Sequence, residues 1–210
     1  RVSFSRKNAM ATAIQAGTDW DITLSTKKTN EKENELEEGI KALKAAVLFG
    51  GFGQRGRHGA SSFIIPELKI KNSKEMIDEM KALTSFYGIK TVTESDKLKE
   101  VSYEKPDNKV RWLNSRIINT SEKDINKILG IIREATHDAA NKKQGLENAL
   151  GSHNNPKFSS PLHTSIYQYE DGSYGVIITE TFHVPKDKNK YNDAKSIYLN
   201  NLEKYLKGGH

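Results

Sequence analysis

The stretch LFGGFGQRGRHGASSF, residues 48–63, holds five glycines within the ten positions 50–59. Three basic side chains stand among these glycines: Arg55, Arg57 and His58. One or two glycines would suffice to end a helix and turn the chain. Five of them around positive charge indicate a backbone that lies close against a ligand, and free N–H and guanidinium groups suit phosphate oxygens. The stretch therefore predicts a phosphate-binding loop, with a purely structural helix end and turn as the alternative.

The residues around this loop predict a helix before it and a strand after it. Apolar residues at helical spacing end near Phe49: Leu36, Ile40, Leu43 and Val47. Residues 62–65 resemble a strand that Pro66 stops. Further upstream, alternating patterns at 2–4 and 20–24 predict two more strands. The predicted order is strand, strand, helix, glycine-rich loop, strand.

Within the loop, residues 51–56 read GFGQRG and formally match the dinucleotide-binding motif G-x-G-x-x-G. That motif requires a strand before the glycines and a helix after them, because the helix N-terminus holds the pyrophosphate. Here the predicted helix ends at the glycines, so its negative end would face the phosphates. The order of elements argues against a dinucleotide enzyme, and the sequence contains no P-loop motif.

Beyond Pro66 the chain predicts a second set of elements. A capping box at 72–75 starts a helix that runs to about Tyr87. Residues 90–119 are polar and are predicted to be irregular, apart from a strand at 110–113. The clearest helix begins at 121–124, and its apolar face comprises Ile125, Ile128, Leu129, Ile132, Ala135 and Ala139.

The C-terminal part predicts a β-hairpin and a last helix. Strands at 164–169 and 174–184 are joined by the turn sequence EDGS. Residues 186–190 are interpreted as a polar loop before the last helix, whose apolar residues are Ile197, Tyr198, Leu202 and Tyr205. The fold class is α+β, in two halves with a junction near residues 66–72.

Composition favours a polyanionic partner. The 210 residues carry a formal net charge of +6, with 29% charged and 35% hydrophobic residues. The absence of cysteine excludes disulfides, thiolate zinc sites and a cysteine nucleophile. Since no apolar run approaches the ~20 residues of a membrane span and no signal-peptide pattern occurs, we expect a cytoplasmic protein without membrane contact.

Two stretches resemble the RAMP superfamily of CRISPR proteins. Residues 51–60 fill the pattern G-h-G-x-x-x-x-x-G-h of the glycine-rich loop that lies between a helix and a strand in those proteins. Residues 155–182, NPKFSSPLH followed by TSIYQYEDGSYGVIITETF, are similar to a strand and hairpin of the same superfamily. The pair is most similar to the first-subunit family of type III-B (Cmr) effector complexes.

The resemblance implies tandem ferredoxin-like (RRM-like) domains with antiparallel sheets. The first, 1–66, would lack its first strand and helix, and the second would be 67–210. The implied function is a non-catalytic RNA-binding subunit in antiviral defence, which contacts CRISPR guide RNA and its duplex with target RNA beside other RAMP subunits. It implies neither a cofactor nor a metal.

The resemblance carries RNA contacts over to the loop itself: Gly50, Gly51, Gly53, Gln54, Arg55, Gly56, Arg57, His58 and Gly59. Further candidate contacts are Arg111, Arg116, Lys142 and Lys143, since arginine beside Trp112 can stack on bases. The alternative is that Trp112 belongs to the core and that these charges form a solvated face.

Two other functions stay open. Some RAMP relatives are metal-independent endoribonucleases that process guide RNA with a histidine, and this sequence has six histidines. His58 suits phosphate or base contact better than catalysis, and His137, at the edge of the apolar helix face, is predicted to be packed and structural. The other function is a protein-interaction scaffold. No H-x-x-x-H or H-E-x-x-H spacing occurs, and Asp19 with Asp21 is too little for a metal site.

Overall fold

The structure, a computed structural model, describes residues 22–25, 35–50, 62, 64–65, 67–95, 99–104, 112–141, 146, 149–150, 160–181 and 187–208. The helices in these ranges are α1 (Glu35–Phe49), α2 (Ser73–Phe86), α3 (Ile125–Asn141) and α4 (Lys188–Leu206). The strands are β1 (Thr91–Ser95), β2 (Glu100–Tyr103), β3 (Trp112–Thr120), β4 (Leu162–Gln168) and β5 (Tyr174–Thr181).

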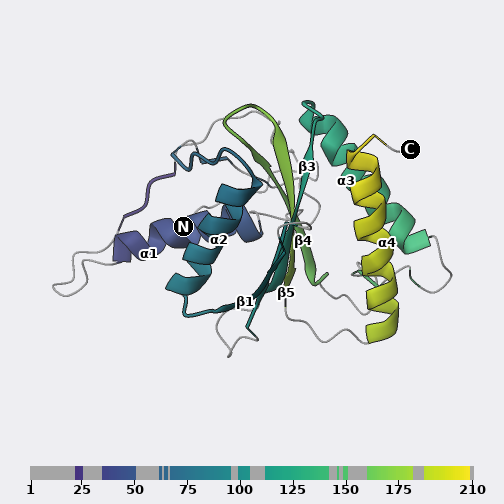
Figure 1. The fold of residues 1–210 in the computed structure, drawn as a ribbon, viewed down its shortest axis with the longest axis horizontal. Helices are drawn as coiled ribbons and strands as arrows, with labels where there is room; N and C mark the ends of the chain where they lie inside the picture. The colour runs from purple at the N-terminus through teal and green to yellow at the C-terminus, as the bar shows by residue number, and fades with distance from the viewer. Residues whose placement is uncertain are drawn as a thin grey trace, which may run out of the picture.

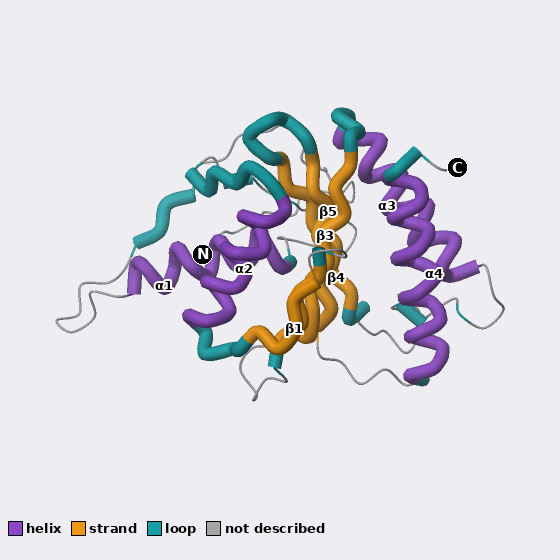
Figure 2. Tube along the Cα trace, viewed as in Figure 1, coloured by secondary structure: helices purple, strands orange, loops and turns teal. Residues whose placement is uncertain are grey.

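The five described strands form one antiparallel sheet in the order β1-β2-β3-β5-β4. Helices α1 and α2 cover one face of this sheet, and α3 and α4 cover the other (Figures 1 and 2). The predicted α+β class is confirmed. Helix α1, which precedes Pro66, packs against β4 and β5, which follow Pro66. The described residues before Pro66 thus pack on a sheet whose described strands all come after it.

The sheet buries apolar side chains on both faces. Neighbouring β3 residues point to opposite sides, so that Ile117 packs with the α1/α2 layer and Ile118 with the α3/α4 layer. Strand β5 is buried at every position from Tyr174 to Glu180. Such a strand cannot show the polar–apolar alternation of a sheet that has one face in water.

Local sequence signals predicted the helices well. Asn72 caps α2, its Oδ1 accepting from the N–H groups of Lys74 and Glu75, as the capping box predicted. The predicted helices at 36–49, 72–87 and 121–141 and the last helix are confirmed, and so is the hairpin at 164–184 as far as Thr181, beyond which residues 182–184 lie outside the described residues. Lys188 begins α4 behind the Asp187 cap, which makes the interpretation of 186–190 as a loop wrong from Lys188 onward.

The prediction of irregular structure over 90–119 is wrong. This region contributes β1, β2 and most of β3. The described part of the short strand predicted at 110–113, residues 112–113, is the start of β3, which extends to Thr120. The strands are mostly polar, and only Val101 and Tyr103 point inward from β2. Pairing of β3 with the apolar β5 orders these residues, a long-range effect that overrides local propensity.

The predicted strands near the N-terminal part are not seen in the described residues. Residues 22–25 form no strand, and neither do Ser62, Ile64 and Ile65. Leu24 lies over α1, within 3.8 Å of where a side chain on Gly39 would begin. The strand predicted at 2–4 lies outside the described residues.

Candidate nucleic-acid interface

The glycine-rich loop is described only at its boundaries. Gly50 follows α1 and its N–H donates to the carbonyl of Ala46 at 3.2 Å. The other predicted loop contacts, from Gly51 to Gly59, lie outside the described residues. Gly50 has no left-handed backbone conformation, and a Cβ there would meet nothing closer than 3.7 Å. The helix end therefore does not itself require glycine at position 50.

Both flanks of the loop contact the sheet. Phe49, the last residue of α1, packs edge-on against Tyr103 of β2, with ring centroids 6.1 Å apart. On the other flank, the Ser62 hydroxyl accepts a hydrogen bond from the Ile166 N–H of β4 at 2.8 Å. Because β4 is the last strand of the described sheet, the chain leaves the loop along a sheet edge.

Several chain segments start or finish at one end of this sheet, which we call the loop end and define by Tyr103, Trp112, Leu162 and Thr181. Trp112 pairs with Thr181, and Leu162 pairs with Glu180, the residue beside Thr181. Tyr103 ends β2 just before the chain turns into β3. Since Phe49 packs on Tyr103, the glycine-rich loop also starts beside this end.

Helix α4 runs along the sheet from the loop end to the opposite end. Near its start, the Tyr191 hydroxyl donates to Glu180 at 2.7 Å, and near its finish the Leu206 carbonyl accepts from Thr120 at 3.1 Å. We call that opposite end, defined by Thr120, Gln168 and Tyr174, the hairpin end. Figure 1 shows the same course of α4 beside the strands.

The further candidate contacts divide into three cases. Arg111 immediately precedes Trp112 in the sequence, at the loop end, but Arg111 itself lies outside the described residues. Lys142 and Lys143 also lie outside; they follow α3, whose Asp138 accepts from Tyr205 near the finish of α4 at 2.6 Å. The described part of α3 thus approaches the hairpin end rather than the loop end.

Arg116 already has a protein partner. Its side chain is 17% exposed and lies on the α4 side of the sheet, 3.4 Å from the carboxylate of Glu203. The pKa of Glu203 is lowered, chiefly by a hydrogen bond from Lys207 and further by the charges of Lys207 and Arg116. An RNA phosphate would have to replace Glu203 to engage Arg116.

Tyr103 carries a buried hydroxyl without a hydrogen-bond partner. Among the described residues, it is the only buried side-chain polar atom without such a partner. The residue is only 5% exposed. Burial raises the pKa of Tyr103, and the nearby Ser115 hydroxyl, which contacts Thr179 at 3.2 Å, lowers it in part. This hydroxyl lies in the α1/α2 layer where α1 ends.

His137, one of the described histidines, lies on the exposed side of α3. His137 is 74% exposed, with its Nδ1 3.8 Å from Asp138 on the same helix, so its prediction as a packed residue is wrong. No group of three or more His, Asp or Glu side chains suited to a metal occurs among the described residues. None of the described helices combines the length and apolar character needed to cross a membrane.

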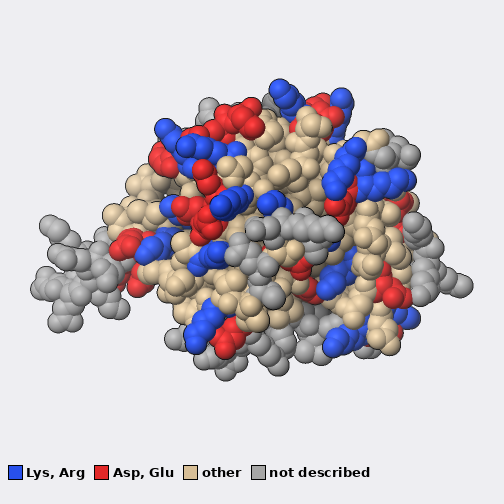
Figure 3. Space-filling model, viewed as in Figure 1, with Lys and Arg blue, Asp and Glu red and all other residues tan. Residues whose placement is uncertain are grey.

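On the face of the molecule that Figure 3 shows, basic and acidic side chains are interspersed. The net charge of +6 is thus not gathered there in one patch of described residues.

Comparison of the chain with protein-family models, curated proteins and solved structures found no match.

Proposed function

We propose that this chain is an RNA-binding subunit of a type III-B CRISPR (Cmr) interference complex, acting in the cytoplasm in antiviral defence. It would contact guide RNA and its duplex with target RNA, beside other RAMP subunits. The observation that carries the proposal is the convergence at the loop end. Phe49, which precedes Gly50, packs on Tyr103, and Trp112, which follows Arg111, pairs with Thr181. Two basic segments that are more than fifty positions apart in the sequence thus adjoin one end of the sheet.

The order of elements in the second half supports the same proposal. Elements β3, α3, β4, β5 and α4 follow the order strand, helix, strand, strand, helix, with β5 between β3 and β4 and every pair antiparallel. Both helices cover one face (Figure 1). This order is similar to the β-α-β-β-α part of a ferredoxin-like unit. Strand β2, antiparallel to β3, takes the position of the final strand.

The proposed chemistry is backbone recognition. Free N–H groups of a glycine-rich loop and two guanidinium groups hold phosphate oxygens, and base pairing between guide and target reads the sequence. Such a role needs neither a nucleophile nor a general base from this chain. It also explains why glycine occurs at Gly50, where the helix end itself does not require it.

Paired substitution of the loop arginines tests the proposal. Arg55→Ala with Arg57→Ala should weaken binding of a labelled guide RNA and lower the steepness of its salt dependence by about 1.4, from about 0.7 per lost single-strand phosphate contact. The matched control is Lys127→Ala with Arg133→Ala, two exposed charges on α3. Fluorescence anisotropy gives the affinities, and circular dichroism checks the fold. Equal affinities for the wild type and the loop variant would refute the loop assignment.

The identity of the RNA tests the CRISPR part of the proposal. RNA cross-linked to the chain in its native host and then sequenced should be enriched in CRISPR guide sequences, with adducts in residues 50–59. A pure scaffold would give no adduct in the loop. Incubation with repeat RNA in the absence of metal should leave the RNA intact; specific cleavage that His58→Ala abolishes would instead establish the processing nuclease.

A further inference from the structure

Three exposed lysines lie at the loop end: Lys90, Lys188 and Lys190. Lys90 precedes β1, and its carbonyl accepts from the N–H of Glu104 at 2.8 Å, just beyond the end of β2. Lys188 and Lys190 stand in the first turn of α4, three residues and one residue before Tyr191, whose hydroxyl bonds to Glu180 beside Thr181. The fold thus brings the charge of Lys90, which precedes β1, and the charges of Lys188 and Lys190, at the start of α4, to one end of the sheet.

These lysines lack described acidic partners. None of the three forms an ion pair with an acidic side chain of the described residues, whereas nearby Lys195 contacts both carboxylate oxygens of Glu180 at 3.0 and 3.1 Å. The Asp187 carboxylate caps α4 by accepting from the backbone N–H groups of Asn189 and Lys190. The ammonium groups of Lys188 and Lys190 are therefore available to a solvent-side anion.

Helix stability does not explain the lysines of α4. A cation in the first turn opposes the helix dipole, which favours acidic residues there. The first turn of α4 contains no acidic residue. Five further basic residues near these strand ends in the sequence lie outside the described residues: Lys105, Lys109, Arg111, Lys157 and Lys186.

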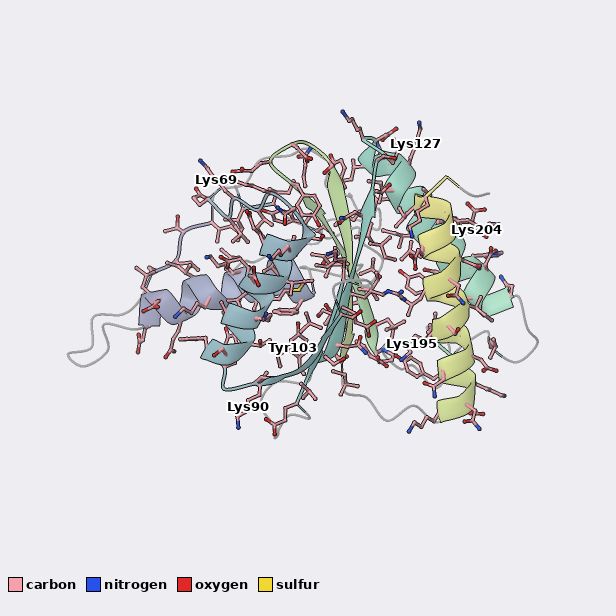
Figure 4. The ribbon with its side chains drawn as sticks, viewed as in Figure 1. Lys69, Lys90, Tyr103, Lys127, Lys195 and Lys204 are labelled. Carbon is pink, nitrogen blue, oxygen red and sulfur yellow. The ribbon has the colours of Figure 1, made fainter. Side chains whose placement is uncertain are left out.

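We propose that Lys90, Lys188 and Lys190 extend the RNA-contacting surface across the loop end, so that one RNA strand runs from the glycine-rich loop over the end of the sheet. This inference rests on the proposed function. Five strands at about 4.8 Å spacing give an end about 19 Å wide. Figure 4 shows Lys90 at the lower end of the view and Lys127 at the upper, hairpin end.

A charge-matched comparison of the two ends tests the inference. The first variant combines Lys90→Ala, Lys188→Ala and Lys190→Ala. The control combines Lys123→Ala, Lys127→Ala and Lys204→Ala, three exposed lysines near the hairpin end. Each variant takes the formal net charge from +6 to +3, so a general charge effect is the same in both. The probe is a fluorescein-labelled single-stranded RNA of mixed sequence, titrated at several salt concentrations.

The loop-end variant should lower the steepness of the salt dependence by about 2, which is three contacts at about 0.7 each, and the control should leave it unchanged. Equal slopes for the two triple variants would overturn the inference. The Arg55/Arg57 variant, measured in parallel, separates the two proposals: if it alone binds weakly, only the lysine surface is wrong. If neither variant differs from its control, the RNA-binding function falls as well.

Discussion

Gly175 shows how one residue without a side chain makes room for another. A Cβ at this position of β5 would lie 2.4 Å from the hydroxyl oxygen and 2.9 Å from the adjacent ring carbon of Tyr169. The ring cannot swing away freely, since its hydroxyl donates to Asn119 at 3.0 Å. The ring of Tyr169 therefore covers the backbone of β5 where a methyl group would stand.

Gly175→Ala should lower the free energy of unfolding by about 1–3 kcal/mol, the usual cost of forcing extra atoms into a packed site. The control is Gly130→Ala on the exposed side of α3, where a Cβ meets nothing within 4 Å. That change should raise stability by about 0.5–1 kcal/mol, because alanine favours the helix. Urea unfolding measures both, and a neutral Gly175→Ala would contradict this packing.

The buried hydroxyl of Tyr103 makes the opposite prediction. Tyr103→Phe removes a hydroxyl that has no partner, so stability should stay equal or rise by about 1 kcal/mol. The matched change is Tyr198→Phe, which removes a hydroxyl bonded to Thr164 at 2.8 Å and should cost about 1 kcal/mol. A clear loss of stability in Tyr103→Phe would mean that this hydroxyl is satisfied in the folded protein.

At the scale of elements, a polar cluster fastens α4 to the sheet. Glu180 of β5, 7% exposed, accepts from Asn114 of β3, Tyr191 and Lys195. Burial raises the pKa of Tyr191, and the charge of Glu180 raises it further, so the tyrosine stays a neutral donor. The carboxylate is thus bonded from three sides and holds the start of α4 at the loop end.

Removing one member of this cluster should be costly. Glu180→Ala leaves Lys195 with no partner for its half-buried charge and should lower the free energy of unfolding by about 3 kcal/mol. Adding Lys195→Met should recover part of that loss, because an apolar chain needs no partner. Thermal unfolding of the two single variants and the double variant measures the coupling, and strictly additive losses would rule out an interaction between the two side chains.

The elements also show which local sequence signals were sufficient to predict a helix or a strand. Helix α3 follows from Ile128, Ile132 and Ala135 on one stripe, and the β4–β5 hairpin follows from its Asp-Gly turn, since both are fixed by neighbours within a few residues. Strand β2 has no such signal. Only two of its four residues point inward, which is too few to predict a strand, and its pairing with β3 orders it.

At the scale of the molecule, the three layers decide which distant residues meet. Helices α1 and α4 lie on opposite faces of the sheet (Figure 1), yet both contact residues next to the loop end: Phe49 of α1 packs on Tyr103, and Tyr191 of α4 bonds to Glu180. Such a meeting depends on strand order and direction. It therefore bears directly on where an RNA strand would run and on why Lys188 and Lys190 belong to the proposed surface.

The sequence by itself determined the four helices, the hairpin, the α+β class and the glycine-rich loop with its arginines, because each depends on spacing or composition within a short stretch. Only the tertiary structure decided that polar residues of 91–120 form three strands, that Arg116 pairs with Glu203, and that Lys90 and Lys188 share one end of the sheet. The physical reason is that these features arise from pairing and packing between residues far apart in the chain, to which local propensity contributes little.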